Sequence, residues 1–236
     1  MVEERKLAFV EHLEELRSRI IKSCIFLIAA VCLSYAFVDS LLPHLAKPVG
    51  RLIFIEPQEA FVTNIKVAFW MGLLLSAPFI LFQVWRFISI GLLAHERKLI
   101  FIFGPISFVL FFTGACFGYF VIVPIGIKFL LSFETNFVIP MITVSRYVSF
   151  VGMLTLSFGI IFELPLAMLF LTKVGIISPQ FLKNKRKHAI VLLFIAAAIL
   201  TPPDVITQLL MALPLLILYE MGILCSQIAF KEKGTF

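Results

Sequence analysis

Charge is scarce in this chain, and that scarcity excludes an ordinary water-soluble domain. Only 14% of the 236 residues are charged, whereas soluble proteins carry about 25%. Hydrophobic residues make up 61% of the sequence, and 27 of its residues are phenylalanine. The apolar segments are too many and too long to form one soluble core. The composition therefore predicts a polytopic membrane protein, and we expect no nucleic-acid partner.

The motifs of enzymes and metal sites are also missing. The four cysteines have the spacing of neither a zinc site nor a disulfide framework, and the four histidines are scattered. The sequence contains no Gly-x-Ser-x-Gly, no His-Glu-x-x-His and no phosphate-binding Gly-x-x-x-x-Gly-Lys-Ser/Thr. We therefore expect no enzymatic activity, no catalytic residue, no metal and no cofactor. Any work must then be driven by an ion gradient or by a partner.

Six apolar runs predict six membrane spans. They cover approximately residues 20–38, 66–88, 99–127, 147–174, 189–203 and 205–230. Apolar residues recur at three- and four-residue steps before the first span, which predicts that residues 1–19 form an amphipathic cytoplasmic helix. That segment lacks the apolar core and cleavage site of a secretory signal.

The predicted fold is therefore all-α: one membrane domain, residues 1–236, with six transmembrane helices in a concave, cupped bundle. Seven prolines lie inside or at the ends of the spans. Each removes a backbone donor and tends to bend its helix, which favours a splayed bundle over a straight one.

Basic residues are distributed unequally between the two membrane faces. An even number of spans puts both termini on one side. That side carries fifteen of the twenty lysines and arginines, and the other carries five. Because basic residues concentrate in cytoplasmic segments, we expect both termini to be cytoplasmic.

The fifth span is short for a membrane. Its apolar part, residues 189–200, ends at Thr201-Pro202-Pro203-Asp204, and at 1.5 Å per residue it reaches about 18 Å across a hydrocarbon layer of roughly 30 Å. Two explanations stay open. The last two spans thin the bilayer or pack against partners, or their helices extend into the interface with polar ends.

Glu163 lies near the middle of the apolar run 147–174. An ionisable side chain there costs roughly 2.5–3.5 kcal/mol on insertion scales, so we expect it to face protein or water and to serve a function. The alternative is a protonated glutamate that only bonds to a neighbouring helix. A proton-coupled transporter would use Glu163 as a relay, but no internal repeat supports that class. An intramembrane hydrolase would need a nucleophile and a base, or paired acids, within the spans. Glu163 has no obvious carboxylate companion at similar depth, since Glu220 lies nearer the cytoplasmic end.

Two further acids, Glu15 and Glu96, are predicted to share the cytoplasmic face. A carboxylate accepts both arms of a guanidinium group, so two such acids beside an apolar groove would suit a basic, partly hydrophobic peptide. The alternative for Glu15 is an i,i+4 pair with Arg19 on a solvated helix, worth about 0.3–0.5 kcal/mol. The alternative for Glu96 is an acid that stabilises a helix start.

Five segments, in the same order along the chain, resemble the TatC family, the multi-spanning receptors of the twin-arginine protein translocase. They are HLEELRSR at 12–19, SAPFILFQVW at 76–85, HER at 95–97, FGIIFELP at 158–165 and LTPPDV at 200–205. The resemblance implies a protein of the cytoplasmic membrane of a prokaryote. It implies binding of signal peptides that carry an arginine pair, before folded cargo crosses the membrane on the proton-motive force. The implied partners are TatA- and TatB-like single-span proteins, membrane lipids and further copies of the chain.

The resemblance also assigns roles to individual residues. Signal-peptide binding is implied for Glu15, Glu96, Arg17 and Phe87, with the two acids reading the arginine pair. Glu163 matches the intramembrane acid of the family. Other positions tied to function are Pro48, Pro78 and Asp204. Positions where partner helices are expected to dock are Thr201 and Gln208.

The chemistry of such a site agrees with the resemblance. Arginine presents a planar fork that lysine lacks, so paired guanidinium–carboxylate contacts would reject a Lys-Lys peptide of equal charge. Exposed ion pairs contribute only about 0.2–1 kcal/mol each. Affinity must then come also from burial of the peptide's apolar segment, at about 25 cal/mol per Å².

Overall fold

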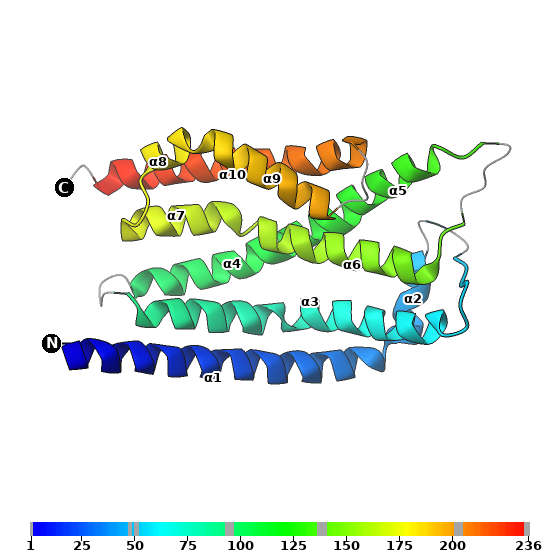
Figure 1. The fold of residues 1–236 in the computed structure, drawn as a ribbon, viewed down its shortest axis with the longest axis horizontal. Helices are drawn as coiled ribbons and strands as arrows, with labels where there is room; N and C mark the ends of the chain where they lie inside the picture. The colour runs from blue at the N-terminus through cyan, green and yellow to red at the C-terminus, as the bar shows by residue number, and fades with distance from the viewer. Residues whose placement is uncertain are drawn as a thin grey trace. The chain divides into compact units, whose positions relative to one another are not determined.

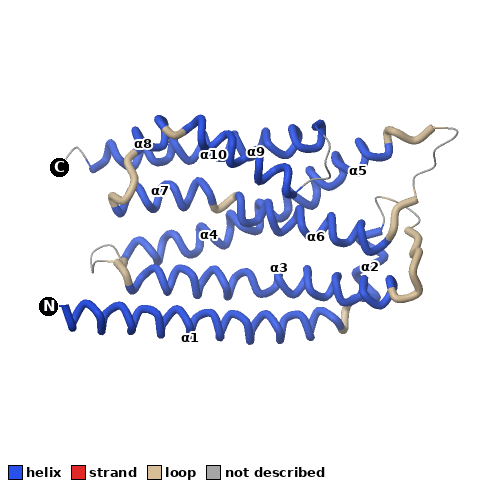
Figure 2. Tube along the Cα trace, viewed as in Figure 1, coloured by secondary structure: helices blue, strands red, loops and turns tan. Residues whose placement is uncertain are grey.

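The computed structural model describes residues 2–46, 49, 52–92, 97–135, 141–200 and 205–233. Helices account for most of them, and Figure 2 shows loops between the helices. In chain order the helices are α1 (Val2–Tyr35), α2 (Val38–Ala46), α3 (Glu59–Ile90), α4 (Lys98–Phe117), the π-helix η1 (Gly118–Ile122), α5 (Val123–Leu131), α6 (Val144–Ile161), α7 (Leu164–Val174), α8 (Pro179–Asn184), α9 (Arg186–Leu200) and α10 (Val205–Lys233) (Figure 1).

Among the described residues, four helical stretches are long and apolar enough to cross a membrane. They are residues 59–90, 98–131, 144–174 and 207–230. Residues 12–35 of α1 meet the same test when taken together with α2, with a bend of 77° between the two. The remaining predicted span corresponds to α9, whose 15 residues reach only about 22 Å at 1.5 Å per residue. The segment predicted as the fifth span is thus a short helix that does not belong to these membrane-crossing stretches. Residues 201–204 lie outside the described part of the chain.

The first span differs from its predicted boundaries. The predicted N-terminal helix and the first span form one continuous helix, α1, which ends at Tyr35 rather than at residue 38. The backbone N–H groups of Ala36 and Phe37 donate to carbonyls three residues earlier, at 3.2 and 3.0 Å. Such i→i−3 bonds tighten the last turn and end an α-helix, so the chain changes direction before α2.

Two prolines account for irregularities inside the long spans, a break at one and a π-helical turn at the other. A proline removes a donor, and its ring clashes with the carbonyl four residues earlier. For Pro165, the carbonyl four residues earlier is that of Ile161, the last residue of α6. The span breaks there, and α7 begins at Leu164. Pro124 lies just after η1, where the N–H of Val123 donates to the carbonyl of Gly118. The wider π-helical turn thus keeps the chain helical past a proline.

The chain divides into two compact units. Unit 1 consists of Met1–Phe108 and Ile142–Gly152, and unit 2 consists of Val109–Met141 and Met153–Phe236. In unit 1, α1 lies along α3 (Figure 1). In unit 2, α10 packs against α7, α9 and α8.

In unit 1 a loop segment is joined to the start of α6. Ile53 and Thr143 form an isolated parallel bridge. The Glu59 carboxylate accepts hydrogen bonds from the backbone N–H of Ile55 at 2.9 Å and from that of Ser145 at 3.1 Å. The bond from Ser145 satisfies an N–H group in the first turn of α6, which has no carbonyl partner within the helix.

In unit 2 close helix contacts depend on glycine. A Cβ atom added at Gly222 of α10 would lie 3.2 Å from the Cα atom of Pro165 in α7. Tyr219, one turn earlier on α10, donates through its hydroxyl to the carbonyl of Leu182 at 2.9 Å. These contacts hold α10 against α7 and α8, and the side chains of Leu215 and Ile223 on α10 are fully buried.

Candidate functional site

The candidate site is built on the antiparallel pair of helices α1 and α3. Contacts between them follow a regular register, in which residue numbers fall along one helix as they rise along the other. A Cβ atom added at Gly72 would lie 2.8 Å from the Cα atom of Val31. Next along the pair, the rings of Phe26 and Phe79 stack with centroids 4.4 Å apart. This close packing fixes the two helices in one register, and the polar contacts follow from it.

Arg19 is the first polar residue in this register. Its Nη1 atom donates a hydrogen bond to Oε1 of Gln83 on α3 at 2.8 Å. Its Nη2 atom forms an ion pair with Oε1 of Glu15, one turn earlier on α1. The Arg19 side chain is only 11% exposed, and that of Glu15 is 32% exposed. The predicted i,i+4 pair of Glu15 and Arg19 is therefore present, but it belongs to a tertiary contact rather than to a solvated helix.

His12 and Phe87 complete the contact at the cytoplasmic end predicted from charge. Their rings stack with centroids 4.5 Å apart and an interplanar angle of 27°. His12, Glu15 and Arg19 are spaced at i, i+3 and i+7, which places them on one face of α1. The structure thus brings Phe87 and Glu15, two of the predicted site residues, to the same α1–α3 surface. Arg17 lies outside that spacing and is exposed.

Several predicted site residues lie outside the described part of the chain. They are Pro48, Glu96, Thr201 and Asp204. Their roles stay predictions. The residues that flank Glu96 in the described structure are Leu92, just after α3, and Arg97, just before α4. The Nε atom of Arg97 donates to the carbonyl oxygen of Leu92 at 3.4 Å, so the two sides of this turn are joined.

Glu163 lies at the break between α6 and α7. It is the N-terminal capping residue of α7, and its carbonyl accepts a hydrogen bond from Ala167 at 2.8 Å. Its Oε1 atom is buried, although the residue as a whole is only partly buried. The acid thus occupies the point where Pro165 interrupts the span. The functional role expected of this acid stays a prediction.

Gln208, a predicted docking residue, connects two helices of unit 2. Its Nε2 atom donates to the carbonyl oxygen of Phe194 at 3.2 Å, which joins α10 to α9. Nearby along the same pair, Arg186 and Glu220 form an ion pair at 2.6 Å. The short helix α9 is therefore held to α10 by polar contacts at two levels.

The sequence did not indicate that Gln83 and His12 belong to the α1–α3 surface. It also did not indicate that Arg19 contacts α3. Their spacing on α1 was a usable signal, because i, i+3 and i+7 positions share a face. The partner on α3 could not be found in that way, since Gln83 is 64 residues from Arg19. Pro78, the remaining predicted position in unit 1, lies on α3 and lines a groove beside α4.

Comparison with known proteins gives the family. The model of the family described as Sec-independent protein translocase protein (TatC) matches residues 11–214. The Sec-independent protein translocase protein TatC of Carboxydothermus hydrogenoformans is 44% identical over 227 residues, which cover 94% of this chain and 93% of that protein. The TatC protein of Aquifex aeolicus is 38% identical over 238 residues, covering 96% and 98% of the two chains.

Solved structures agree with this result. A crystal structure of the twin arginine translocase receptor TatC has a TM-score of 0.85 and 38% sequence identity, and covers 92% of this chain and 99% of its own. A second crystal structure, of the receptor in DDM, has a TM-score of 0.84 at 38% identity and covers 90% and 98%. The likeness confirms the predicted all-α class of a multi-pass membrane protein. The chain therefore belongs to the TatC family of Sec-independent protein translocase proteins.

Proposed function

We propose that this core component of the twin-arginine translocase is the receptor for signal peptides that carry an arginine pair, with Glu15 and Glu96 as the acids that bind the two guanidinium groups. The observation that carries the proposal is the pairing of Glu15 with Arg19. The carboxylate already holds a guanidinium group at the α1–α3 surface. The local geometry therefore suits the chemistry of arginine.

Glu15 has capacity for a second guanidinium group. Arg19 bonds to its Oε1 atom, and none of the described residues hydrogen-bonds to Oε2. A carboxylate offers about four acceptor positions. An incoming arginine can therefore bind Glu15 without first removing Arg19, and Gln83 keeps Arg19 in place while it does so.

The acids supply specificity, and apolar contact supplies most of the affinity. Leu13 and Ile20 are exposed apolar side chains on α1 near Glu15. An apolar peptide segment that covers such side chains gains about 25 cal/mol per Å². Phe87 and Arg17 belong to the same receptor surface in this proposal, with Phe87 held by its stack on His12.

The finer parts of the function follow from the family. TatA- and TatB-like single-span proteins dock along α9 and α10 through Thr201 and Gln208, copies of the chain associate in a larger complex, and the proton-motive force drives transport of folded cargo. Glu163 is the intramembrane acid of that process. Pro48, Pro78 and Asp204 support receptor function. Both termini are cytoplasmic.

Photocrosslinking of a labelled signal peptide tests the receptor function. The purified protein in nanodiscs carries a photoreactive residue at Ser18 or at Lys98, beside Glu15 and Glu96 respectively. We expect an Arg-Arg peptide to crosslink and a Lys-Lys peptide of equal charge to crosslink much less. Replacement Glu15→Gln removes a charged acceptor, and we expect about tenfold weaker binding, because hydrogen bonds to charged groups contribute about 1.5–3 kcal/mol.

Matched variants separate this site from general charge attraction. Glu96→Gln should weaken crosslinking as Glu15→Gln does. Glu14→Gln removes the same charge from an exposed neighbour on α1 and should leave crosslinking unchanged. Equal labelling by the Arg-Arg and Lys-Lys peptides would refute the receptor assignment of these acids.

Sidedness has its own test. In a variant without native cysteines, Lys98→Cys and Glu134→Cys place single thiols at the two ends of the helical stretch 98–131. A membrane-impermeant thiol reagent added to spheroplasts should label the second and spare the first. The reverse pattern would place the termini on the outer side.

A further inference from the structure

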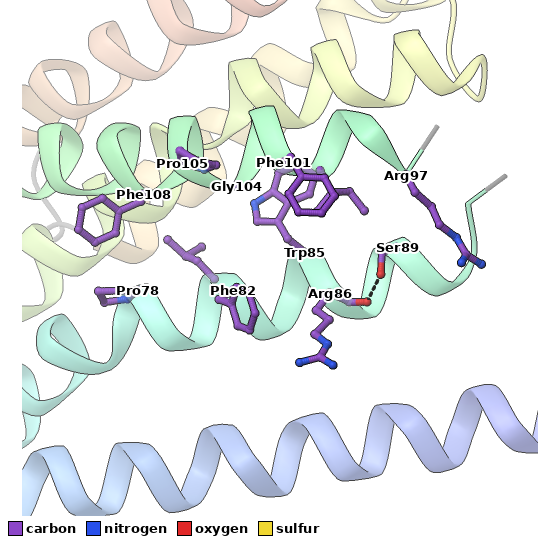
Figure 3. A pocket seen from close by; sticks show the side chains of 12 residues that line it. Pro78, Phe82, Trp85, Arg86, Ser89, Arg97, Phe101, Gly104, Pro105 and Phe108 are labelled. Carbon is purple, nitrogen blue, oxygen red and sulfur yellow. Dashed lines mark hydrogen bonds between the residues drawn. The ribbon is translucent and has the colours of Figure 1, made fainter. Parts of the chain in front are cut away.

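A groove lies between the end of α3 and the start of α4, wholly within unit 1. Its volume is about 570 Å³. Figure 3 shows Pro78 and Phe108 at one end of the groove, with Ser89 and Arg97 at the other. Because the two ends follow the length of two membrane-spanning helices, the groove runs from the apolar layer towards the membrane surface.

The inner part of the groove is apolar. Trp85 and Phe103 form a stack beneath it, with ring centroids 5.8 Å apart. Phe101 on α4 is 84% exposed and Phe82 on α3 is 55% exposed. These two side chains face the groove with no described part of the chain covering them, so they are available to an apolar ligand.

Gly104 shows that the space along α4 is open. A Cβ atom added there would meet no other atom within 4 Å, so the glycine is not required by close packing of another helix. Glycine within a helix is less favourable than alanine. The absence of a side chain at Gly104 therefore leaves room in the groove beside α4, although a side chain there would stabilise the helix.

The outer end of the groove is basic. Arg86 of α3 and Arg97 at the start of α4 both line it, together with Ser89. Ser89 donates through its hydroxyl to the carbonyl of Arg86 at 2.5 Å. Neither arginine forms an ion pair with a carboxylate of the described residues. Both arginines are exposed, so their charges are available to a ligand.

From this arrangement we infer that the α3–α4 groove binds an anionic phospholipid, with an acyl chain along Phe82 and Phe101 and the phosphate at Arg86 and Arg97. Basic pockets between membrane helices bind anionic headgroups in this way, and the guanidinium fork suits phosphate oxygens. A signal peptide is the less fitting occupant, because its own arginine pair would meet two further positive charges. Glu15 and Phe87 are not among the described residues that line the groove, although Arg97 is the sequence neighbour of Glu96. The inference does not rest on the receptor function.

Trp85 provides a direct reporter. The chain has two tryptophans, so Trp70→Phe leaves Trp85 as the only one. The full-length variant is reconstituted into phosphatidylcholine vesicles that contain a small, increasing fraction of acyl-brominated phosphatidylglycerol or acyl-brominated phosphatidylcholine. Bromine quenches tryptophan on contact. We expect brominated phosphatidylglycerol to reach half-maximal quenching at a roughly tenfold lower fraction, since each arginine strengthens anionic lipid binding several-fold.

Three variants in the Trp70→Phe background test the named residues. The double substitution Arg86→Gln with Arg97→Gln should abolish the preference for phosphatidylglycerol and keep contact quenching by both lipids. Lys98→Gln removes a charge beside Arg97 that does not line the groove, and should keep the preference. Gly104→Leu fills the open wall and should reduce quenching by both lipids. Circular dichroism and gel filtration check that each variant is folded.

The opposite results would overturn the inference. Equal quenching by the two brominated lipids would show that the groove has no headgroup preference. A preference that survives the double arginine substitution would place the lipid elsewhere. A twin-arginine peptide with a nitroxide in its apolar segment, quenching Trp85 and displacing the brominated lipid, would show that the groove belongs to the peptide.

Discussion

Arg19 forms an ion pair with Glu15 of α1 through its Nη2 atom and donates a hydrogen bond to Gln83 of α3 through its Nη1 atom. The guanidinium group therefore orients the carboxylate that is proposed to read a signal peptide. A mostly buried arginine with two polar partners also contributes to helix packing. The receptor surface and the stability of the α1–α3 pair thus depend on the same side chain.

A double-mutant cycle measures this connection. Arg19→Gln and Gln83→Leu should each lower the unfolding temperature of the purified protein, because each removes a partner from a part-buried hydrogen bond. The two effects should be non-additive, with a coupling free energy of about 1 kcal/mol. Ser18→Ala with Gln83→Leu provides the control cycle, in which additive effects are expected. Additive effects in the first cycle would contradict the bridging role of Arg19.

Two glycines should respond oppositely to the same substitution. Gly72→Ala places a Cβ atom 2.8 Å from the Cα atom of Val31, and we expect a loss of about 1–3 kcal/mol from the forced separation of α1 and α3. Gly104→Ala meets open space and should stabilise the helix by about 0.5–1 kcal/mol. Thermal unfolding in one detergent compares the two. Equal changes would show that the α1–α3 contact is looser than described.

Glu163 can be tested as a functional acid. We expect Glu163→Gln to stop transport of folded cargo in vesicles that contain the partner proteins and a proton gradient, while leaving folding unchanged. Its Oε1 atom is buried at the break before Pro165, and the amide keeps its size. Glu134→Gln, at an exposed position, is the control and should transport normally.

The same vesicles distinguish the alternatives for this acid. Normal transport by Glu163→Gln with lower stability would leave it only a packing role. Uptake of small molecules by vesicles that lack the partner proteins would instead support a proton-coupled transporter.

Gln208 can be tested as a docking residue. Its amide nitrogen donates to Phe194, and none of the described residues donates to its amide oxygen, which can accept from a partner helix. In a variant without native cysteines, Leu209→Cys places a thiol at a neighbouring exposed position. We expect it to form disulfides with cysteines introduced along a TatB-like helix, and Gln208→Leu to reduce their yield several-fold. An unchanged yield would place the partner on another surface.

The sequence predicted those parts of the fold that depend on local composition. The apolar run 205–230 corresponds closely to α10, and the short fifth span was visible in its length. Proline chemistry predicted bending, and Pro165 does break its span. The exact site of the break and the π-helical turn at 118–122 depend on which carbonyl each N–H can reach, which composition does not reveal.

The candidate site was only partly predictable, for a similar reason. Glu15 and Phe87 could be named from the family resemblance, and the structure places both on one surface. The bond from Arg19 to Gln83 joins residues that are distant in sequence and depends on helix register. That register is set by the close approach of Gly72 and Val31, a tertiary contact that no local pattern encodes.

Unit 1 consists of two segments that are separated in the sequence by part of unit 2, and this affects the order in which its contacts form during synthesis. The α1–α3 pair is complete once residue 90 has entered the membrane. Unit 1 also contains Ile142–Gly152, which the ribosome delivers only after the whole of 109–141, a stretch of unit 2. The bond from Ser145 to Glu59 must therefore wait for that later synthesis. A chain truncated after residue 108 would keep the α1–α3 pair but lack the Ser145 bond to Glu59, so unit 1 does not correspond to one continuous segment of the chain.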